Sequence, residues 1–150
     1  MKGSYPRFFA MIITSTGVML ALMYSTVYVA DHIWWSQTKG WMALYMGAAM
    51  AVVMLAFMLG MYADKRKNLM IFAGSALVFA VALFFVRAQT TVGDVAWMKA
   101  MIPHHSIAIL TSERAQISDP RVRELADEII EAQRREIAEM EALIADLEDQ

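Results

Sequence analysis

One short stretch of the sequence, Trp97–His105, brings together residue types that can bind a soft metal ion. In a helix, Met101 lies three residues before His104 and four before His105, and Met98 lies seven before His105. Side chains at these spacings share one face. Adjacent histidines point about 100° apart, so one metal ion takes only one of them unless the preceding proline distorts the turn.

Thioether sulfur suits Cu(I), and imidazole suits several transition metals, including copper. The chain contains no cysteine, which excludes disulfides, thiolate metal sites, iron–sulfur clusters and cysteine nucleophiles. The alternative interpretation is that Met98 and Met101 pack a helical core while His104 and His105 are polar residues at a surface or an interface.

A second set of candidates, Gln133, Glu136 and Met140, falls on the apolar seam of a later helical segment. Polar groups at core positions cost stability unless they have partners. Gln133 and Glu136 are therefore expected to form hydrogen bonds with the histidines, to set the register of the two helices, or to orient a metal-binding imidazole through its other ring nitrogen. Met140 completes a soft ligand set if it lies opposite Met101.

These residues require two helices in an antiparallel arrangement. The first is expected over about Val95–Gln116, with Pro103 inside it as a kink or a new start. The second is expected to begin with Asp119 as N-cap and Pro120 in the first turn, and to reach about Leu147. Two helices cannot bury both apolar faces alone, so self-association into a four-helix bundle is expected.

The rest of the chain has the composition of a membrane protein, with 59% hydrophobic and 19% charged residues among 150. Apolar runs over residues 8–30, 41–62 and 69–86 are each close to the roughly 20 residues that span a bilayer as a helix. The predicted fold is therefore all-α, with a membrane domain over residues 1–92 and a helical hairpin over 93–150. Ten of the 14 methionines lie in the three runs, where helix packing is favoured over a path for metal permeation.

Basic residues indicate the orientation. Lys2, Arg7 and Lys65–Lys67 flank one side of the predicted membrane, whereas Lys39 and Arg87 lie on the other. Because loops rich in Lys and Arg remain in the cytoplasm, the N-terminus is expected there and the C-terminal domain in the periplasm of a bacterium. Residues 94–150 carry a formal charge of −7, which argues against nucleic acid as a partner.

The hairpin residues resemble the bacterial "domain of unknown function 305" family. The similarity covers about residues 93–147 and is carried by the run Met101-Ile102-Pro103-His104-His105, followed by Ala108, Ala126, Ile129, Ile130, Gln133, Glu136, Ile137 and Met140. The resemblance implies a ferritin-like helical domain, with some members binding copper in the periplasm. Carried over by position, it favours Met101, His104, His105 and Met140 as ligands.

Motifs that would indicate an enzyme are missing from the sequence, including the Glu-x-x-His pair of di-iron proteins, the zinc protease motif, a phosphate-binding loop and a nucleophile elbow. The sequence thus predicts a non-enzymatic, membrane-anchored periplasmic protein. Its expected role is to bind copper, or silver in its place, for storage, buffering or handover to an envelope metal-handling partner. The alternative is a structural module whose hairpin oligomerises or docks a partner.

Overall fold

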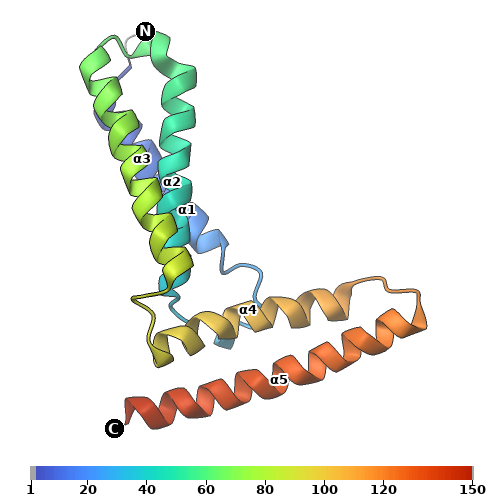
Figure 1. The fold of residues 1–150 in the computed structure, drawn as a ribbon. Helices are drawn as coiled ribbons and strands as arrows, with labels where there is room; N and C mark the ends of the chain where they lie inside the picture. Colours follow the sequence, from blue (N-terminus) through green and yellow to red (C-terminus); the bar gives the residue numbers. More distant parts are fainter. Residues whose placement is uncertain (1–2, 150) are drawn as a thin grey trace. The chain divides into compact units, whose positions relative to one another are not determined.

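The computed structural model describes residues 3–149, and these form helices and connecting segments without a β-strand. The elements are α1 (Tyr5–Leu22), η1 (Ala30–His32), α2 (Gln37–Met58), η2 (Leu59–Met61), α3 (Lys65–Ala88), α4 (Asp94–Arg114) and α5 (Pro120–Glu148). The predicted all-α fold class is therefore confirmed. The chain divides into two compact units (Figure 1).

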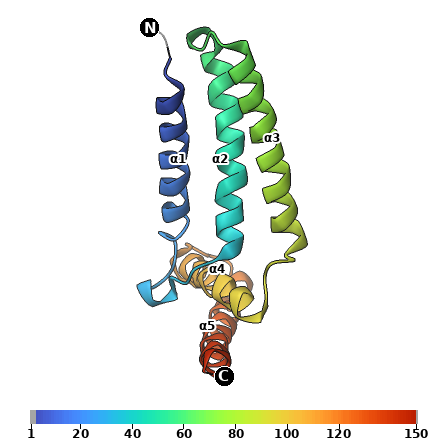
Figure 2. The same cartoon turned by 90° about the vertical axis from the view of Figure 1, so that its left-hand side faces the viewer.

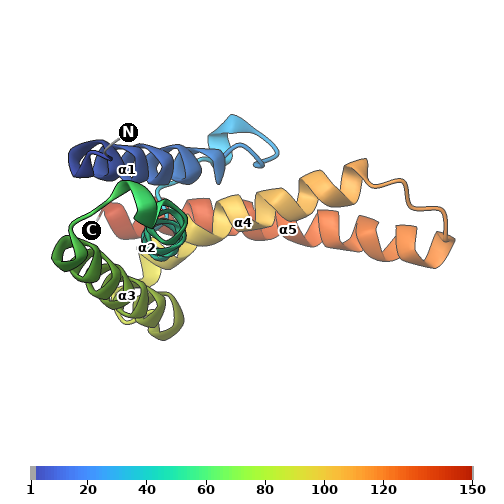
Figure 3. The ribbon, with the colours of Figure 1, turned by 90° about the horizontal axis from the view of Figure 1, so that it is seen from above.

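The first unit, called the apolar unit, comprises the chain up to Leu22 together with Thr38–Thr91. Figures 2 and 3 show α2 lying between α1 and α3. All three helices are long and apolar enough to cross a membrane, at 18 residues for Tyr5–Leu22, 25 for Gln37–Met61 and 24 for Lys65–Ala88. Their shared core contains Phe8, Ile12, Ala51, Leu55, Tyr62 and Ile71.

Local sequence explains how α3 begins and ends. Asp64 is its N-cap and accepts a hydrogen bond from the backbone N–H of Lys67 at 3.1 Å, which pairs one of the free donors at a helix start. The buried Asn68 then accepts from the Tyr5 hydroxyl at 2.8 Å and donates to the Tyr62 carbonyl at 2.9 Å. At the far end Gln89 adopts a left-handed conformation with φ 53°, a common way to stop a helix.

The second unit, called the hairpin unit, comprises Met23–Gln37 and the chain from Val92 onward. Helices α4 and α5 run antiparallel, joined by a short turn (Figure 1). Asp119 caps α5 by accepting from the Arg121 N–H at 2.9 Å, and Pro120 is the first helical residue. Helix α4 continues through the buried Pro103, so the proline does not start a separate segment.

A core of seven buried side chains holds the hairpin together. It draws three residues from α4 and four from α5: Met98, Ile102, Ile109, Ile130, Ile137, Met140 and Ile144. Ile102 is 0% exposed and Ile109 1% exposed. Because burial of a large aliphatic side chain contributes roughly 1.5–3 kcal/mol, this core is the main source of stability for the pair of helices.

The first apolar helix ends at Leu22, eight residues before the end of the predicted span over residues 8–30. The segment that follows leaves the α-helical conformation, and two of its tyrosines make hydrogen bonds within the hairpin unit. Tyr24 accepts from the Ser36 N–H at 3.0 Å, and the Tyr28 N–H donates to Ser106 on α4 at 2.6 Å. Residues 23–37, called the strap, therefore pack on the hairpin although the apolar count assigned their first part to a membrane span.

Candidate metal centre

His105 is a polar side chain that contacts both hairpin helices. Its Nδ1 lies 2.9 Å from the carbonyl oxygen of Met101, one turn earlier on α4. Its Nε2 lies 2.9 Å from Oε2 of Glu136 on α5. The imidazole is thus oriented by contacts from both helices, and its side chain is only 13% exposed.

The partners of His105 fix its protonation pattern. A backbone carbonyl can only accept a hydrogen bond, so Nδ1 carries a hydrogen. A carboxylate is also only an acceptor, so the contact between Nε2 and Glu136 requires a proton shared by the two groups. In its place a metal ion can bind Nε2, with the Met101 carbonyl fixing the ring from behind, as is usual for metal-binding histidines.

Sulfur ligands lie one turn away from this pair. Met101 precedes His105 by four residues and Met140 follows Glu136 by four. Because α4 and α5 are antiparallel and the His105–Glu136 contact sets their register, Met101 and Met140 lie at the same level. Met140 is 6% exposed and belongs to the hairpin core, against which the partly buried Met101 packs.

The remaining candidates, Met98, His104 and Gln133, make no direct contact with His105 like those of Met101 and Glu136. Met98 precedes His105 by seven residues, about 10 Å along the helix axis, and is 5% exposed in the hairpin core. His104 is exposed, and its ring centroid lies 6.1 Å from that of His105. Gln133 lies one turn beyond Glu136 on the side away from Met140 and is partly buried. The structure therefore joins His105 to Met101 and Glu136 by direct contacts, and the register of the hairpin puts Met140 at the level of Met101.

The donor chemistry restricts which metal fits. Within residues 3–149, no three His, Asp or Glu side chains gather closely enough to hold a metal ion. A zinc site normally takes four nitrogen, oxygen or thiolate ligands, and this arrangement does not supply them. One imidazole nitrogen and thioether sulfurs from both helices instead suit a soft monovalent ion, whereas the nearby carboxylate is a hard donor that contributes its charge.

A second polar cluster beside the site was not predicted. The Ser106 hydroxyl, 0% exposed, accepts from the Tyr28 N–H and lies 2.8 Å from Nδ1 of His32. The Lys99 ammonium lies 5.3 Å from the ring centroid of Trp34, a cation–π contact. Ser106 directly follows His105, so these contacts fasten the strap to α4 at the level of the candidate site. In the sequence, the sole indication of these contacts is Ser106, a hydroxyl residue on the apolar face of α4.

Comparison with known proteins agrees with the resemblance seen in the sequence. Residues 85–150 match a family described as a domain of unknown function, DUF305. The C-terminal part of this chain resembles that family. The match includes both hairpin helices and every candidate ligand.

A curated relative covers more of the chain. It is an uncharacterized protein of Acanthamoeba polyphaga mimivirus, 28% identical over 138 residues, with 84% of this chain and 91% of the relative aligned. That span is longer than the DUF305 match, so the similarity also includes part of the apolar unit. No solved structure matches the chain.

Proposed function

We propose that this protein is a membrane-anchored metal-binding protein whose hairpin takes up Cu(I), or Ag(I) in its place. The observation that carries the proposal is the fixed orientation of His105, whose Nδ1 is held by the Met101 carbonyl while Nε2 faces Glu136. Met101 and Met140 add sulfur from both helices one turn away. Storage, buffering or handover to another envelope protein is the role that suits a site without a catalytic group.

The location is part of the proposal. Three helices able to span a membrane precede the hairpin, and the basic residues concentrate at the N-terminus and between α2 and α3. The positive-inside rule favours the cytoplasm for these segments, and with three crossings this supports a periplasmic hairpin. Alkaline phosphatase, active only outside the cytoplasm, fused to the C-terminus would be active; an inactive fusion that is stably produced would overturn this topology.

The binding test uses the full chain, purified in detergent without a polyhistidine tag. Ag(I) serves as a redox-stable probe in chloride-free buffer, titrated against a competing ligand. His105→Ala, Met101→Leu and Met140→Leu are each expected to lower the affinity at least tenfold. Met70→Leu is the matched control, because Met70 is 57% exposed on α3; it is expected to leave binding unchanged.

Two outcomes would overturn the proposal. One is the absence of stoichiometric Ag(I) binding by the folded protein. The other is binding that the three hairpin variants and the Met70→Leu control alter equally, which would place the metal on surface thioethers. His104→Gln tests the second histidine: because His104 is exposed, we expect a smaller loss than for His105→Ala.

An interaction module is the second candidate function, and exposed apolar residues on α5 favour it. Leu125, Leu143 and Leu147 are 55%, 46% and 42% exposed, and their spacing places them on one flank of the helix. Such a flank suits a second copy of the hairpin, giving a four-helix bundle. Leu143→Glu is expected to lower the mass measured by sedimentation equilibrium, whereas Ala145→Glu, on an exposed face of the same helix, is not. A wild-type protein that sediments as a monomer would exclude this module as a self-association device.

A further inference from the structure

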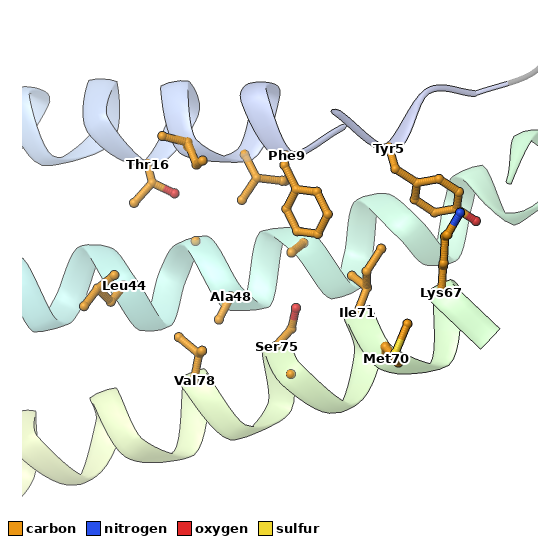
Figure 4. Close-up of a pocket in the computed structure, with 15 residues that line it drawn as sticks. Tyr5, Phe9, Thr16, Leu44, Ala48, Lys67, Met70, Ile71, Ser75 and Val78 are labelled. Atoms are coloured by element: carbon orange, nitrogen blue, oxygen red, sulfur yellow. The ribbon is translucent and has the colours of Figure 1, made fainter. Parts of the chain in front are cut away.

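The apolar unit contains a groove of about 620 Å³ that is separate from the hairpin. Figure 4 shows its lining side chains, which come from α1, α3 and the α2 helix that runs between them. Its floor is buried and includes Ala48 and Ala51 of α2, which are 7% and 6% exposed. Its walls are exposed apolar side chains, among them Phe9, Met70 and Val78 at 48%, 57% and 45% exposure.

One end of the groove is cationic. Lys67 lines it there, with its ammonium 5.4 Å from the centroid of the Tyr5 ring and 3.3 Å from Oδ2 of Asp64. The Lys67–Asp64 ion pair is exposed, at 55% and 42% of the two side chains, so it is weak and leaves the ammonium able to contact another anion. Lys65 and Arg66 are exposed next to it in the first turn of α3.

The length of the groove matches one leaflet of a bilayer. From Lys67 to Val78 is eleven residues, which is about 16 Å along a helix. Half of the roughly 30 Å hydrocarbon core of a bilayer is about 15 Å. A ligand with an anionic group at Lys67 and an apolar part along the groove would therefore have the orientation of a phospholipid, with its headgroup at the membrane surface and its chain in one leaflet.

We propose that this groove binds one acyl chain of an anionic phospholipid, with the lipid phosphate on Lys67 and its basic neighbours. Basic residues beside membrane helices are a recurring means of recognising anionic headgroups. A helix from a second copy fits less well, because a lipid phosphate supplies the anion that the exposed Lys67 ammonium can bind. The apolar runs of this chain also carry no Asp or Glu, so such a helix offers Lys67 no partner.

The test compares phosphatidylglycerol with phosphatidylcholine of the same acyl chains, using native mass spectrometry of the full chain released from detergent micelles. Wild-type protein is expected to retain one phosphatidylglycerol with at least fivefold higher occupancy than phosphatidylcholine. Lys67→Gln should reduce this preference severalfold, and Lys67→Arg should keep it. Arg87→Gln removes a cation from the other end of α3 and should leave the preference intact.

A second pair of variants tests the groove itself. A side chain at Gly74, which lines the groove, would meet no atom within 4 Å of its Cβ, and neither would one at Gly17, which does not line it. Gly74→Leu therefore adds a side chain to the groove lining with no clash at its Cβ, and Gly17→Leu is the matched control. Gly74→Leu is expected to lower phosphatidylglycerol occupancy severalfold and Gly17→Leu to leave it unchanged.

Three results would overturn the proposal: equal retention of both lipids, equal effects of the two glycine variants, or a wild-type dimer that Gly74→Leu converts to a monomer without a change in bound lipid. The last result would assign the groove to a second copy of the chain. None of these readouts depends on Ag(I) or on the hairpin.

Discussion

Replacing Glu136 by glutamine tests the role of the carboxylate that faces His105. Two unit charges about 4 Å apart interact by about 1 kcal/mol in water and about 4 kcal/mol near a protein surface, and this range bounds the attraction between Glu136 and a cation bound to Nε2. The Glu136 side chain is 45% exposed, so the lower half of this range, about 1–2 kcal/mol, applies. This corresponds to a loss of about 5- to 30-fold in Ag(I) affinity at 1.36 kcal/mol per tenfold.

The stability of the metal-free protein should change much less. The amide of the glutamine can donate to Nε2 of a neutral imidazole, while Nδ1 continues to donate to the Met101 carbonyl. The Ag(I) titration is carried out at pH 8, because protons compete less with the ion for an imidazole nitrogen there than at lower pH. Glu139→Gln is the matched control, because it removes the same charge from an exposed position one turn along α5.

An unchanged Ag(I) affinity for Glu136→Gln would show that the carboxylate does not face the bound ion. Equal losses of Ag(I) affinity for Glu136→Gln and Glu139→Gln would show that the Glu136 carboxylate contributes only the general electrostatic attraction of an acidic helix. Either result would refute the reasoning from the 2.9 Å contact between Nε2 and Oε2.

Three further predictions concern the hairpin unit. Ile102→Ala removes a side chain that is 0% exposed and should lower the free energy of unfolding, measured by denaturant titration, by about 2–5 kcal/mol. Leu125→Ala is the control, because Leu125 is 55% exposed, and it should lower this free energy by less than about 0.5 kcal/mol. Ser106→Ala leaves the Tyr28 N–H without its acceptor, at a cost of about 1–3 kcal/mol, and hydrogen exchange of the Tyr28 amide should accelerate while that of the α5 core does not. The pKa of Asp119 is lowered, chiefly by hydrogen bonds from the neighbouring guanidinium and also from backbone N–H groups. Its stabilisation of the α5 start is therefore complete above the ordinary carboxyl pKa of about 4 and is lost as pH falls through the lowered value. Opening of the first turn of α5, measured by hydrogen exchange, should increase only under such acid conditions, and Asp119→Ala should abolish this pH dependence.

Much of the architecture could be predicted because it rests on local signals. The apolar runs of residues 41–62 and 69–86 predict α2 and α3 to within a few residues, since a helix able to cross a bilayer needs a long stretch without charge. The start of α5 follows from Asp119 and Pro120, whose side chains suit the first helical positions. Helix α4 was also expected near its observed bounds.

The strap could not be predicted, because nothing local distinguishes it from a membrane helix. Tyr24, Tyr28 and their neighbours are apolar enough on average to extend the first span. What removes them from it is a set of long-range contacts, above all the hydrogen bond from the Tyr28 N–H to Ser106, 78 residues away. Hydropathy averaged over a window does not contain that information.

The candidate site shows the same division between local and long-range information. Helical spacing placed Met101 and His105 on one face and Glu136 on the seam of the partner helix. The register that joins His105 to Glu136, and so sets Met101 level with Met140, depends on how the hairpin core packs. Spacing alone also could not show that Met98 is taken up by that core while His104 is exposed.

The strap also belongs to the compact unit that holds the candidate metal centre. The predicted boundary at residue 93 separates the hairpin from Met23–Gln37, which belong to the same compact unit. Without the strap, the fully buried Ser106 hydroxyl loses its hydrogen bond from Tyr28, and the core loses the packing of Tyr28 and Trp34. Ser106 adjoins His105, so a fragment cut at residue 93 lacks contacts that fix α4 beside the candidate ligand. Metal affinity measured on the full chain is therefore the quantity that bears on function, because there the strap is held at both ends by α1 and α2.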